Sequence, residues 1–336
     1  MKEKGKIYIF CPAYFATGGP ELLHQLHFKL KKRGINSFIY YTGKVDLNLD
    51  YTNDRLKHYV GLDEIADVIE DNEKNYLVIP ETYFNDLKYS KINFLFWWLS
   101  VDHFLIKNGF NPKIVTKTNL KNKVKVLINR SPYNRIKEIL IKQQIKYHLF
   151  QSYYAKSFLE SLYIRNVLPL SDYINPNVIY KGEYLNKENI IIYNPQKGIE
   201  IIQYLMKYAP SHFRWIPIEN MTPEQISKLL STAKVYVDFG NHPGKDRIPR
   251  EAVLNNCCII TNKIGSSKNH FDIPISNKYK FENPIESSTQ IYKLLQGIFN
   301  NFDQNLSKFD NYKKIIINEE NLFEEQIDLL LNRIQL

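Results

Sequence analysis

Short apolar runs alternate with stretches of helical periodicity along most of the chain. In the first half, the runs typical of buried strands are residues 7–10, 38–41, 76–79 and 93–97. The connection after the first run begins with Gly-Gly-Pro at 18–20, and leucines follow at four-residue spacing up to Leu30. This pattern predicts an amphipathic helix that ends at Gly34. Strand, glycine loop and helix in this order predict a βα unit of a parallel sheet.

A second series of the same kind begins near Asn189. Its expected strands are 190–193, 213–216, 235–239 and 258–261, and its expected helices are 198–207, 223–230 and 248–255. Prolines gather between the two series, around residue 170, where periodicity is weak. We therefore expect an α/β fold of two doubly wound, Rossmann-like domains, with the limits 1–170 and 171–312, and a C-terminal helix at 313–336.

Composition agrees with an ordinary globular protein of two domains. The chain has 336 residues, of which 44% are hydrophobic and 24% charged. Its three cysteines lie in or beside apolar runs, which excludes a disulfide framework and a zinc cluster. The apolar stretch near the start is too short for a signal peptide, and residues 92–99 are too few for a membrane-spanning helix of about 20 residues. We expect a cytoplasmic protein.

The charge balance favours anionic partners. Lysine and arginine outnumber aspartate and glutamate by 45 to 35, which suits nucleic acid, anionic membrane or phosphate-bearing ligands. Apolar residues interleave with basic ones in segment 130–150, which predicts a basic amphipathic helix leading into a strand. Such a helix either docks on anionic lipid or covers the core with its basic face in solvent. Its basic residues are Arg130, Arg135, Lys137, Lys142 and Lys146.

Unusual residues gather where strands of the predicted sheets end, which is where ligands bind in open parallel sheets. Gly18 and Gly19 remove side chains at a helix N-terminus, although a plain tight turn explains them equally well. In loop 194–198, Lys197 and Gly198 lead into a helix whose dipole also favours a phosphate. The alternative for Lys197 is a solvated lysine beside a turn.

The densest group of polar residues is segment 238–252, between a buried strand and an amphipathic helix. Lys245, Arg247 and Arg250 can neutralise a diphosphate, and Glu251 can accept hydrogen bonds from ribose hydroxyls. Cations placed in advance stabilise a departing nucleoside diphosphate without a metal. Alternatively, the acidic residues only complement a helix dipole while the basic ones face solvent.

The glycine loop, the Asn-Pro-x-Lys-Gly loop and the Pro-Arg-Glu-Ala helix start resemble those of a GT-B glycosyltransferase over nearly the whole chain. The resemblance implies two Rossmann-like domains facing a cleft, with the nucleotide sugar on the C-terminal domain, the acceptor on the N-terminal domain, and a last helix that crosses back. It places Lys197 and Arg247 on the diphosphate, Glu251 on the ribose and the backbone around Ile218 on the base. The full donor-binding set is Gly18, Gly19, Lys197, Gly198, Ile218, His242, Gly244, Lys245, Arg247, Arg250 and Glu251.

One departure from the family leaves the stereochemistry open. Many retaining GT-B enzymes have two glutamates eight positions apart. In this sequence, the position that matches the first glutamate is occupied by Pro243. His242-Pro243 is similar to a His-Pro pair of transferases with cytidine-linked donors, so the donor base also stays open. For an inverting reaction the candidate bases are Asp102, His103 and Glu81. The nearby Trp97-Trp98 pair either stacks on an acceptor sugar or belongs to the core.

These observations predict a nucleotide-sugar-dependent glycosyltransferase that acts on a glycan or lipid-linked acceptor in lipopolysaccharide or capsule synthesis. No two aspartates are two positions apart, so no metal or other cofactor is expected. A sugar-nucleotide epimerase or hydrolase of the same architecture is the nearest alternative. A basic protein that binds single-stranded nucleic acid is the alternative from another class, but the sequence has no RNA-binding signature.

Overall fold

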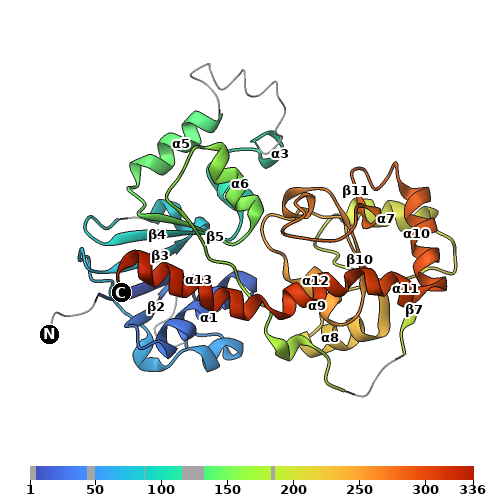
Figure 1. Cartoon of the computed structure of the whole chain (residues 1–336), viewed down its shortest axis with the longest axis horizontal. Coiled ribbons are helices and arrows are strands. Elements are labelled where there is room, and N and C mark those ends of the chain that lie inside the picture. Colours follow the sequence, from blue (N-terminus) through green and yellow to red (C-terminus); the bar gives the residue numbers. More distant parts are fainter. Residues whose placement is uncertain (1–4, 44–49, 87, 116–131, 183–185) are drawn as a thin grey trace. The chain divides into compact units, whose positions relative to one another are not determined.

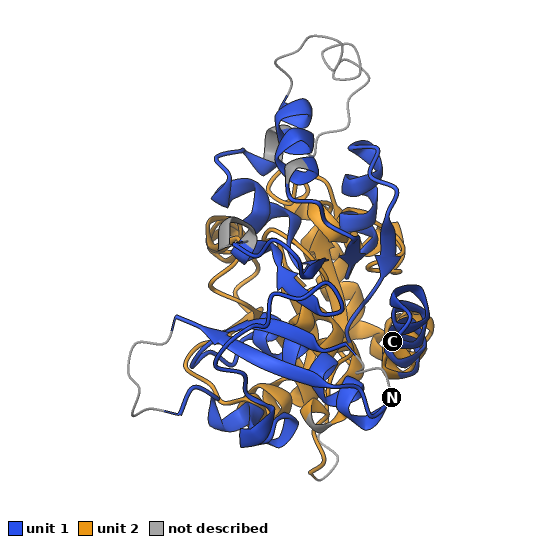
Figure 2. Cartoon of the chain, turned by 90° about the vertical axis from the view of Figure 1, so that its left-hand side faces the viewer, with its two compact units in different colours: residues 1–172, 321–336 blue, residues 173–320 orange. Residues whose placement is uncertain are grey.

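A computed structural model describes residues 5–43, 50–86, 88–115, 132–182 and 186–336 of the chain. The chain forms two compact units, each with its own core (Figures 1 and 2). Unit 1 contains Met1–Asp172 and Asn321–Leu336, and unit 2 contains Tyr173–Glu320. The chain thus passes from unit 1 to unit 2 after Asp172 and returns to unit 1 at Asn321.

In the described part of unit 1, six parallel strands form one sheet in the order β2-β1-β3-β4-β5-β6. The inner strands β1, β3 and β4 are buried on both faces because they are almost continuously apolar, whereas the edge strand β2 alternates buried and partly exposed residues. The strands are β1 (Ile7–Pro12), β2 (Ser37–Thr42), β3 (Tyr76–Pro80), β4 (Asn93–Trp98), β5 (Tyr147–Phe150) and β6 (Val167–Pro169).

The helices of unit 1 connect these strands and cover the sheet (Figure 1). They are α1 (Gly18–Lys32), α2 (Val101–Lys107), α3 (Pro112–Val115), α5 (Pro132–Lys142), α6 (Tyr153–Ser161) and most of α13 (Glu319–Ile334). The proline-rich segment near residue 170 is not only a linker, because Val167–Pro169 is the edge strand β6. Pro169 is tolerated there because an edge strand leaves one side of its backbone without a hydrogen-bonded neighbour.

Helix α13 is fastened to unit 1 by side-chain contacts along its length. Arg33 donates from Nε to Asp328 at 2.7 Å, and the hydroxyl of Tyr76 donates to the carbonyl of Ile334 at 2.9 Å. The amide of Ser171 donates to Gln326 at 2.6 Å. The stretch expected as one helix from 313 to 336 contains parts of two helices, because α12 (Asp310–Ile317) ends before α13 begins.

In the described part of unit 2, five parallel strands form a sheet in the order β11-β10-β9-β7-β8. The strands are β7 (Glu188–Tyr193), β8 (Arg214–Pro217), β9 (Ala233–Asp238), β10 (Cys258–Asn262) and β11 (Lys280–Phe281). The helices are α7 (Ile199–Tyr208), α8 (Pro223–Thr232), α9 (Arg247–Leu254), α10 (Ser288–Asn300), α11 (Phe302–Leu306) and α12. The expected α/β architecture of two doubly wound units with a C-terminal helix is confirmed.

Both sheets share a topological feature that positions a binding site. The first strand of each unit lies inside its sheet, so that β1 has β2 and β3 as neighbours and β7 has β8 and β9. The chain leaves the first strand toward one side and later returns to the other side. The loops at the carboxyl ends of the strands diverge at this switch point and leave a crevice, which is where open α/β sheets bind ligands.

Candidate functional site

The site in unit 2 is built from the loops that follow β7, β9 and β10. Two glycines let the first two loops approach each other closely. Gly198 has a φ of +63°, and a Cβ atom there would lie 2.5 Å from the carbonyl oxygen of Phe239. A Cβ atom at Gly240 would lie 2.4 Å from the Cβ of Lys197. The backbone of the β9 loop therefore fixes where the Lys197 side chain begins.

The β10 loop packs against the same place. Gly265 has a φ of +59°, and a Cβ atom there would lie 2.0 Å from the carbonyl oxygen of His242. The amide of Ser266 donates to that oxygen at 2.9 Å. The side-chain amide of Asn262 also donates to the carbonyl of Gly240 at 2.7 Å. The three loops thus hold His242 rigidly at the switch point between β7 and β9.

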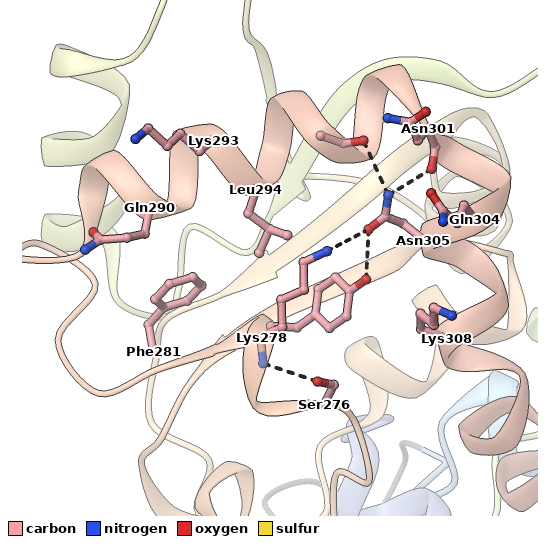
Figure 3. A pocket seen from close by; sticks show the side chains of 12 residues that line it. Ser276, Lys278, Phe281, Gln290, Lys293, Leu294, Asn301, Gln304, Asn305 and Lys308 are labelled. Atoms are coloured by element: carbon pink, nitrogen blue, oxygen red, sulfur yellow. Dashed lines mark hydrogen bonds between the residues drawn. The ribbon is translucent and has the colours of Figure 1, made fainter.

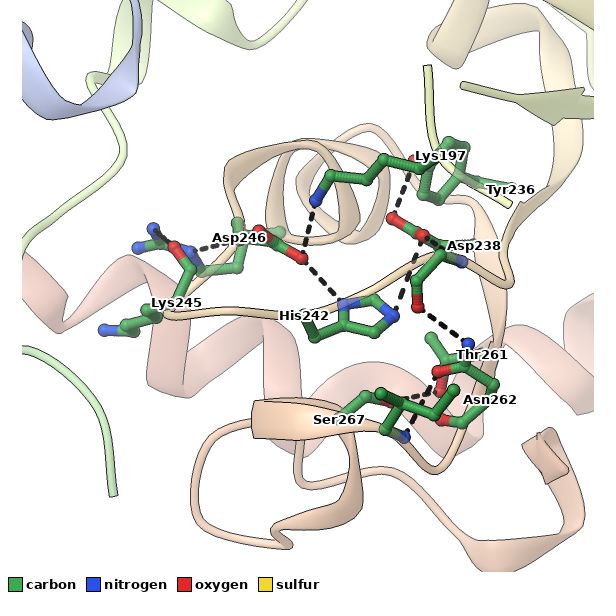
Figure 4. A network of polar contacts seen from close by, with 12 residues as sticks. Lys197, Tyr236, Asp238, His242, Lys245, Asp246, Thr261, Asn262 and Ser267 are labelled. Carbon is green, nitrogen blue, oxygen red and sulfur yellow. Dashed lines mark hydrogen bonds and ion pairs between the residues drawn. The ribbon is translucent and has the colours of Figure 1, made fainter. Parts of the chain in front are cut away.

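His242 lies between two carboxylates (Figure 4). Its Nδ1 donates to Oδ2 of Asp246 at 2.7 Å, and its Nε2 lies 3.6 Å from Oδ1 of Asp238. The ammonium of Lys197 pairs with the same Asp246 oxygen at 2.9 Å. Asp238 also accepts from the hydroxyl of Tyr236 at 3.0 Å. We call Lys197, Asp238, His242 and Asp246 the switch-point cluster.

The charges of this cluster support one another. Burial alone would lower the pKa of His242, but the carboxylates of Asp238 and Asp246 outweigh it, and the pKa lies above its usual value. Burial raises the pKa of Asp246, yet the hydrogen bond from His242 and the charge of Lys197 leave it below its usual value. The arrangement therefore favours an imidazolium, a lysine cation and a carboxylate side by side.

The same residues include a group that meets the geometric needs of a metal ion. Ligand atoms of Asp238, His242 and Asp246 all lie within 4.8 Å of one another. Two carboxylates and an imidazole suit several divalent transition metals. The cluster is also balanced without an ion, because Lys197 and the proton on His242 supply positive charge to both carboxylates.

Arg250, expected in the donor-binding set, is held inside the loop. Its side chain is fully buried and donates to Glu319 at 2.7 Å from one nitrogen. It also donates to the carbonyls of Asp246 at 3.1 Å and Lys245 at 3.1 Å. A guanidinium held in this way braces the loop from within and does not face a ligand. Sequence reasoning missed this role because Glu319 is 69 positions away.

The other expected donor residues lie on the same loop and on α9. Lys245 pairs with Glu319 at 2.9 Å, so it shares the carboxylate that holds Arg250. Arg247 lies 3.4 Å from Glu251, one helical turn further on, and both are partly buried. Gly244 lies in the loop that leads into α9.

Ile218 lies directly beyond the end of β8. Its amide donates to the carbonyl of Tyr193 at 2.8 Å, which brings it beside the loop that carries Lys197. That N–H is therefore already used, and only the remaining backbone groups of the segment are open to a base. The loops at the carboxyl ends of β7, β8 and β9 are thus neighbours, and they carry Lys197, Gly198, Ile218 and His242.

Sequence reasoning missed Asp238 and Tyr236 as members of the site and treated Asp246 only as a complement to a helix dipole. A signal was present, because Asp238, His242 and Asp246 are spaced four residues apart. That spacing alone does not predict that the three side chains contact one another, because the segment is a loop and not a helix. The loop takes its shape from the close backbone approaches at Gly198, Gly240 and Gly265.

In unit 1, Glu81 follows β3 at the switch point between β1 and β3. Its carboxylate accepts from the amide of Leu99 at 3.0 Å and is almost fully buried. Burial raises its pKa to about 7, although amide hydrogen bonds and the charge of Lys107 act in the opposite direction. A carboxyl group with such a pKa is suited to exchange a proton at neutral pH.

Asp102 and His103 do not form a pair. Asp102 is buried and accepts from the hydroxyl of Tyr154 at 2.7 Å, whereas the side chain of His103 is exposed. Neighbouring residues of a helix point in different directions, so the two side chains diverge. Both lie on α2, which begins after the end of β4.

Trp97 and Trp98 are core residues and not a stacking platform. Both are completely buried. The indole of Trp97 donates to the carbonyl of Leu170 at 2.8 Å, and that of Trp98 donates to His148 at 3.0 Å. Of the two interpretations of this pair, the core interpretation is therefore confirmed.

Gly18 and Gly19 begin α1, as expected from the sequence. Thr17 at the N-cap makes no side-chain hydrogen bond to the helix, so the capping oxygen that usually meets the first amides does not come from this residue. A Cβ atom at Gly19 would lie 3.9 Å from Leu99, which leaves room for a methyl group. Gly19 is therefore not required by packing within the described residues.

The fold is that of GT-B glycosyltransferases. HepE of Anabaena, in complex with UDP and glucose, is 10% identical with a TM-score of 0.62, covering 98% of this chain and 100% of that chain. Sucrose-phosphate synthase of Thermosynechococcus elongatus is 12% identical with a TM-score of 0.64, and the match covers 99% of this chain and 98% of the other. WaaG, a glycosyltransferase involved in lipopolysaccharide biosynthesis, is 10% identical with a TM-score of 0.52, covering 98% and 99%. No protein-family model and no curated protein matches the sequence.

Proposed function

We propose that the chain is a glycosyltransferase that moves a sugar from a nucleotide-sugar donor to a glycan or lipid-linked acceptor in surface polysaccharide synthesis. The observation that carries the proposal is the switch-point cluster, where Lys197 and His242 lie at the position in which an open α/β sheet binds its ligand. The GT-B fold of both units supports it. Lipopolysaccharide and capsule are the candidate products.

In this proposal the donor diphosphate binds beside Lys197 and the β9 loop. Its oxygens compete with Asp246 for the ammonium of Lys197, and Arg247 turns from Glu251 toward the phosphates. Glu251, released from Arg247, then accepts hydrogen bonds from the ribose, and the backbone near Ile218 contacts the base. Cations fixed in this way stabilise the charge that grows on the leaving nucleoside diphosphate.

The proton on His242 has a defined task in this scheme. An imidazolium between Asp238, which is buried, and Asp246, which is partly buried, prevents the two carboxylates from repelling the incoming diphosphate. His242 therefore acts through the charge balance of the loop, because its ring is buried. Glu81 and Asp102 remain the candidate bases of the acceptor unit for an inverting reaction, with His103 as the exposed alternative. Both stereochemical outcomes stay open.

We also propose that the reaction needs no metal. The positive charge that a metal would bring to the diphosphate is supplied by Lys197 and Arg247. Activity should therefore persist in EDTA. Loss of activity in EDTA that Mn²⁺ restores would overturn this part and would point to Asp238, His242 and Asp246 as ligands.

The proposal is tested by thermal unfolding of the full chain with UDP-, GDP-, dTDP-, ADP- and CMP-sugars. A ligand at a hundredfold its dissociation constant adds about 2.7 kcal/mol of stability, which raises the melting temperature measurably. The free nucleosides, which lack phosphates, serve as controls and should give no shift. A chain that no nucleotide sugar stabilises is not a transferase of this kind. Product analysis with a stabilising donor then separates transfer to an acceptor from epimerisation or hydrolysis.

A further inference from the structure

A hollow lies in unit 2, away from the switch-point cluster (Figure 3). It has a volume of about 780 Å³ and lies beside β11, the edge strand of the sheet. Strand β10 separates β11 from β9, and no member of the switch-point cluster lines the hollow. The lining comes from α10, α11 and the short 3-10 helices at Asn277–Tyr279 and Ser307–Phe309, together with their flanking residues.

The hollow is positively charged. Its lining includes Lys278, Lys293 and Lys308 but no acidic residue. Among the described residues, Lys293 and Lys308 form no hydrogen bond or ion pair, and both are exposed. This differs from the switch-point cluster, where Lys197 already has a carboxylate partner. The charge of the hollow is therefore available to an anion from solution.

Asn305, which lines the hollow, is held in place by hydrogen bonds. Asn305 is buried, and its amide nitrogen donates to the carbonyls of Asn301 at 2.8 Å and Gly297 at 3.3 Å. Its oxygen accepts from the hydroxyl of Tyr279 at 2.9 Å and from the ammonium of Lys278 at 3.4 Å. A Cβ atom at Gly297 would meet no atom within 4 Å, so this glycine leaves open space above α10.

The remaining lining suits a sugar. Gln290, Asn301 and Gln304 are exposed amides, which both donate to and accept from hydroxyl groups. Phe281, which is partly buried, adds apolar surface of the kind that packs against the C–H face of a sugar ring. The volume lies within the range of small-molecule sites, about 300–1,000 Å³, which fits a short oligosaccharide segment.

We propose that this hollow binds a carbohydrate that carries carboxylate or phosphate groups. The lysines pair with the charged groups, and the amides bind the hydroxyls. A single-stranded nucleic acid fits the lining less well, because base stacking uses several aromatic platforms and Tyr279 is buried, which leaves only Phe281. The proposal concerns binding alone, so it holds or fails independently of sugar transfer.

The test measures binding of labelled oligosaccharides to the full chain without any donor. The probes are oligogalacturonate, which carries carboxylates, a phosphomannan oligosaccharide, which carries phosphates, and a neutral maltooligosaccharide of the same length. At least one acidic probe should bind, and its binding should weaken as salt is raised. The two acidic probes distinguish the kinds of anionic group. Failure of both, or equal binding of the neutral probe, would overturn the proposal.

Variants then locate the site. Lys293→Ala and Lys308→Ala should each weaken binding of the acidic probe about threefold to fivefold, as expected for exposed ion pairs, and the double variant about tenfold or more. Lys228→Ala on α8, also exposed, should leave binding unchanged. Equal weakening by Lys228→Ala would show nonspecific attraction. Tighter binding of a single-stranded oligonucleotide, lost in the same double variant, would identify a nucleic-acid site and refute ours.

Discussion

At the residue scale, the basic side chains of the β9 loop and its neighbours differ in how far a ligand can reach them. The side chain of Lys197 is 29% exposed and that of Arg247 is 19% exposed. Lys245 is 13% exposed and Arg250 is 0% exposed, and both are held by Glu319. Because a diphosphate must displace the existing partner of each cation, the two more exposed side chains are the ones we assign to it.

Replacing Lys197 or Arg247 by alanine should lower turnover far more than it lowers stability. Loss of one fixed donor to the leaving group raises a reaction barrier by about 2.7–4 kcal/mol, by analogy with the loss of one oxyanion-hole donor. Loss of a partly exposed ion pair costs about 1 kcal/mol of folding stability or less. Steady-state kinetics with the stabilising nucleotide sugar and urea unfolding measure the two effects. Lys228→Ala is the control, and wild-type turnover in either variant removes that residue from the mechanism.

Glu81 makes a different prediction, because its carboxyl group is buried and its pKa is raised from 4.5 to about 7. Between these two values the folded chain keeps a proton that the unfolded chain has lost. The contribution of Glu81 to the free energy of unfolding is therefore most favourable below pH 4.5 and declines as the pH rises to about 7. The decline amounts to about 3 kcal/mol, since each pH unit is worth about 1.4 kcal/mol.

Glu81→Gln removes this titration while it keeps an oxygen for the amide of Leu99. The free energy of unfolding of the variant, relative to the wild type, should rise by about 3 kcal/mol between about pH 4 and pH 8. Urea unfolding of both proteins across this range measures the difference, in which all other titrating groups cancel. A difference that stays constant with pH would contradict the raised pKa.

At the scale of secondary structure, periodicity predicted the strands β1 to β4 and β7 to β10 and the helices α1, α7, α8 and α9 to within a few residues. These elements carry strong local signals, such as four consecutive apolar residues in β1 and the Thr-Pro start of α8. Strand β11 was missed because it has only two residues. Strand β6 was missed because its three residues include a proline, which is typical of a linker as well as of an edge strand.

The candidate site was less predictable than the elements that carry it. Lys197 and His242 were chosen because each follows a strand, and the sheet order brings those strands together. Which cations would face outward was not predictable, because the partner of Lys245 and Arg250 comes from the start of α13. Local patterns contain no information about such distant pairing, which depends on how the whole of unit 2 packs.

Arg250→Ala should destabilise the protein strongly, whereas Arg247→Ala on the same helix should not. Removing Arg250 leaves Glu319 buried without the guanidinium that holds it, and breaking a buried ion pair costs about 3–5 kcal/mol. Arg247 is a matched control, because it has the same side chain one turn earlier on α9 but pairs with Glu251 in a partly exposed place. Denaturant unfolding compares the two, and equal stability would contradict a structural role for Arg250.

At the scale of the whole molecule, the excess of positive charge bears on how the chain meets anionic surfaces. The net charge is +10. Within the described ranges, none of the helices combines the length and the apolar character that crossing a bilayer requires. We propose that the protein works in the cytoplasm and touches the inner face of the membrane only at its periphery. Helix α5 is the candidate contact.

Most of the apolar side of α5 is not available for insertion into lipid, although Ile141 is exposed. Ile136 and Leu140 are buried in the core of unit 1, so this side of the helix covers the sheet. On the other side, Arg135 lies 5.5 Å from the ring centre of Phe110, and Lys137 lies 5.5 Å from that of Tyr163. Lys146 follows the helix, and Arg130 lies outside the described residues. Contact with lipid would therefore rest on the basic side chains, with Ile141 as the exposed apolar residue of the helix.

Flotation with liposomes tests this contact on the intact protein. The chain should float with anionic liposomes at low salt and should not float with neutral liposomes. At high salt it should not float with anionic liposomes either, because salt screens the charge attraction. Arg135→Ala combined with Lys137→Ala should reduce the bound fraction, since each basic side chain near the surface adds about 1 kcal/mol. Lys207→Ala with Lys228→Ala removes the same charge from exposed positions of unit 2 and controls for net charge. Equal flotation with neutral lipid, or an unchanged bound fraction in the α5 variant, would leave α5 as a helix that only covers the core of unit 1.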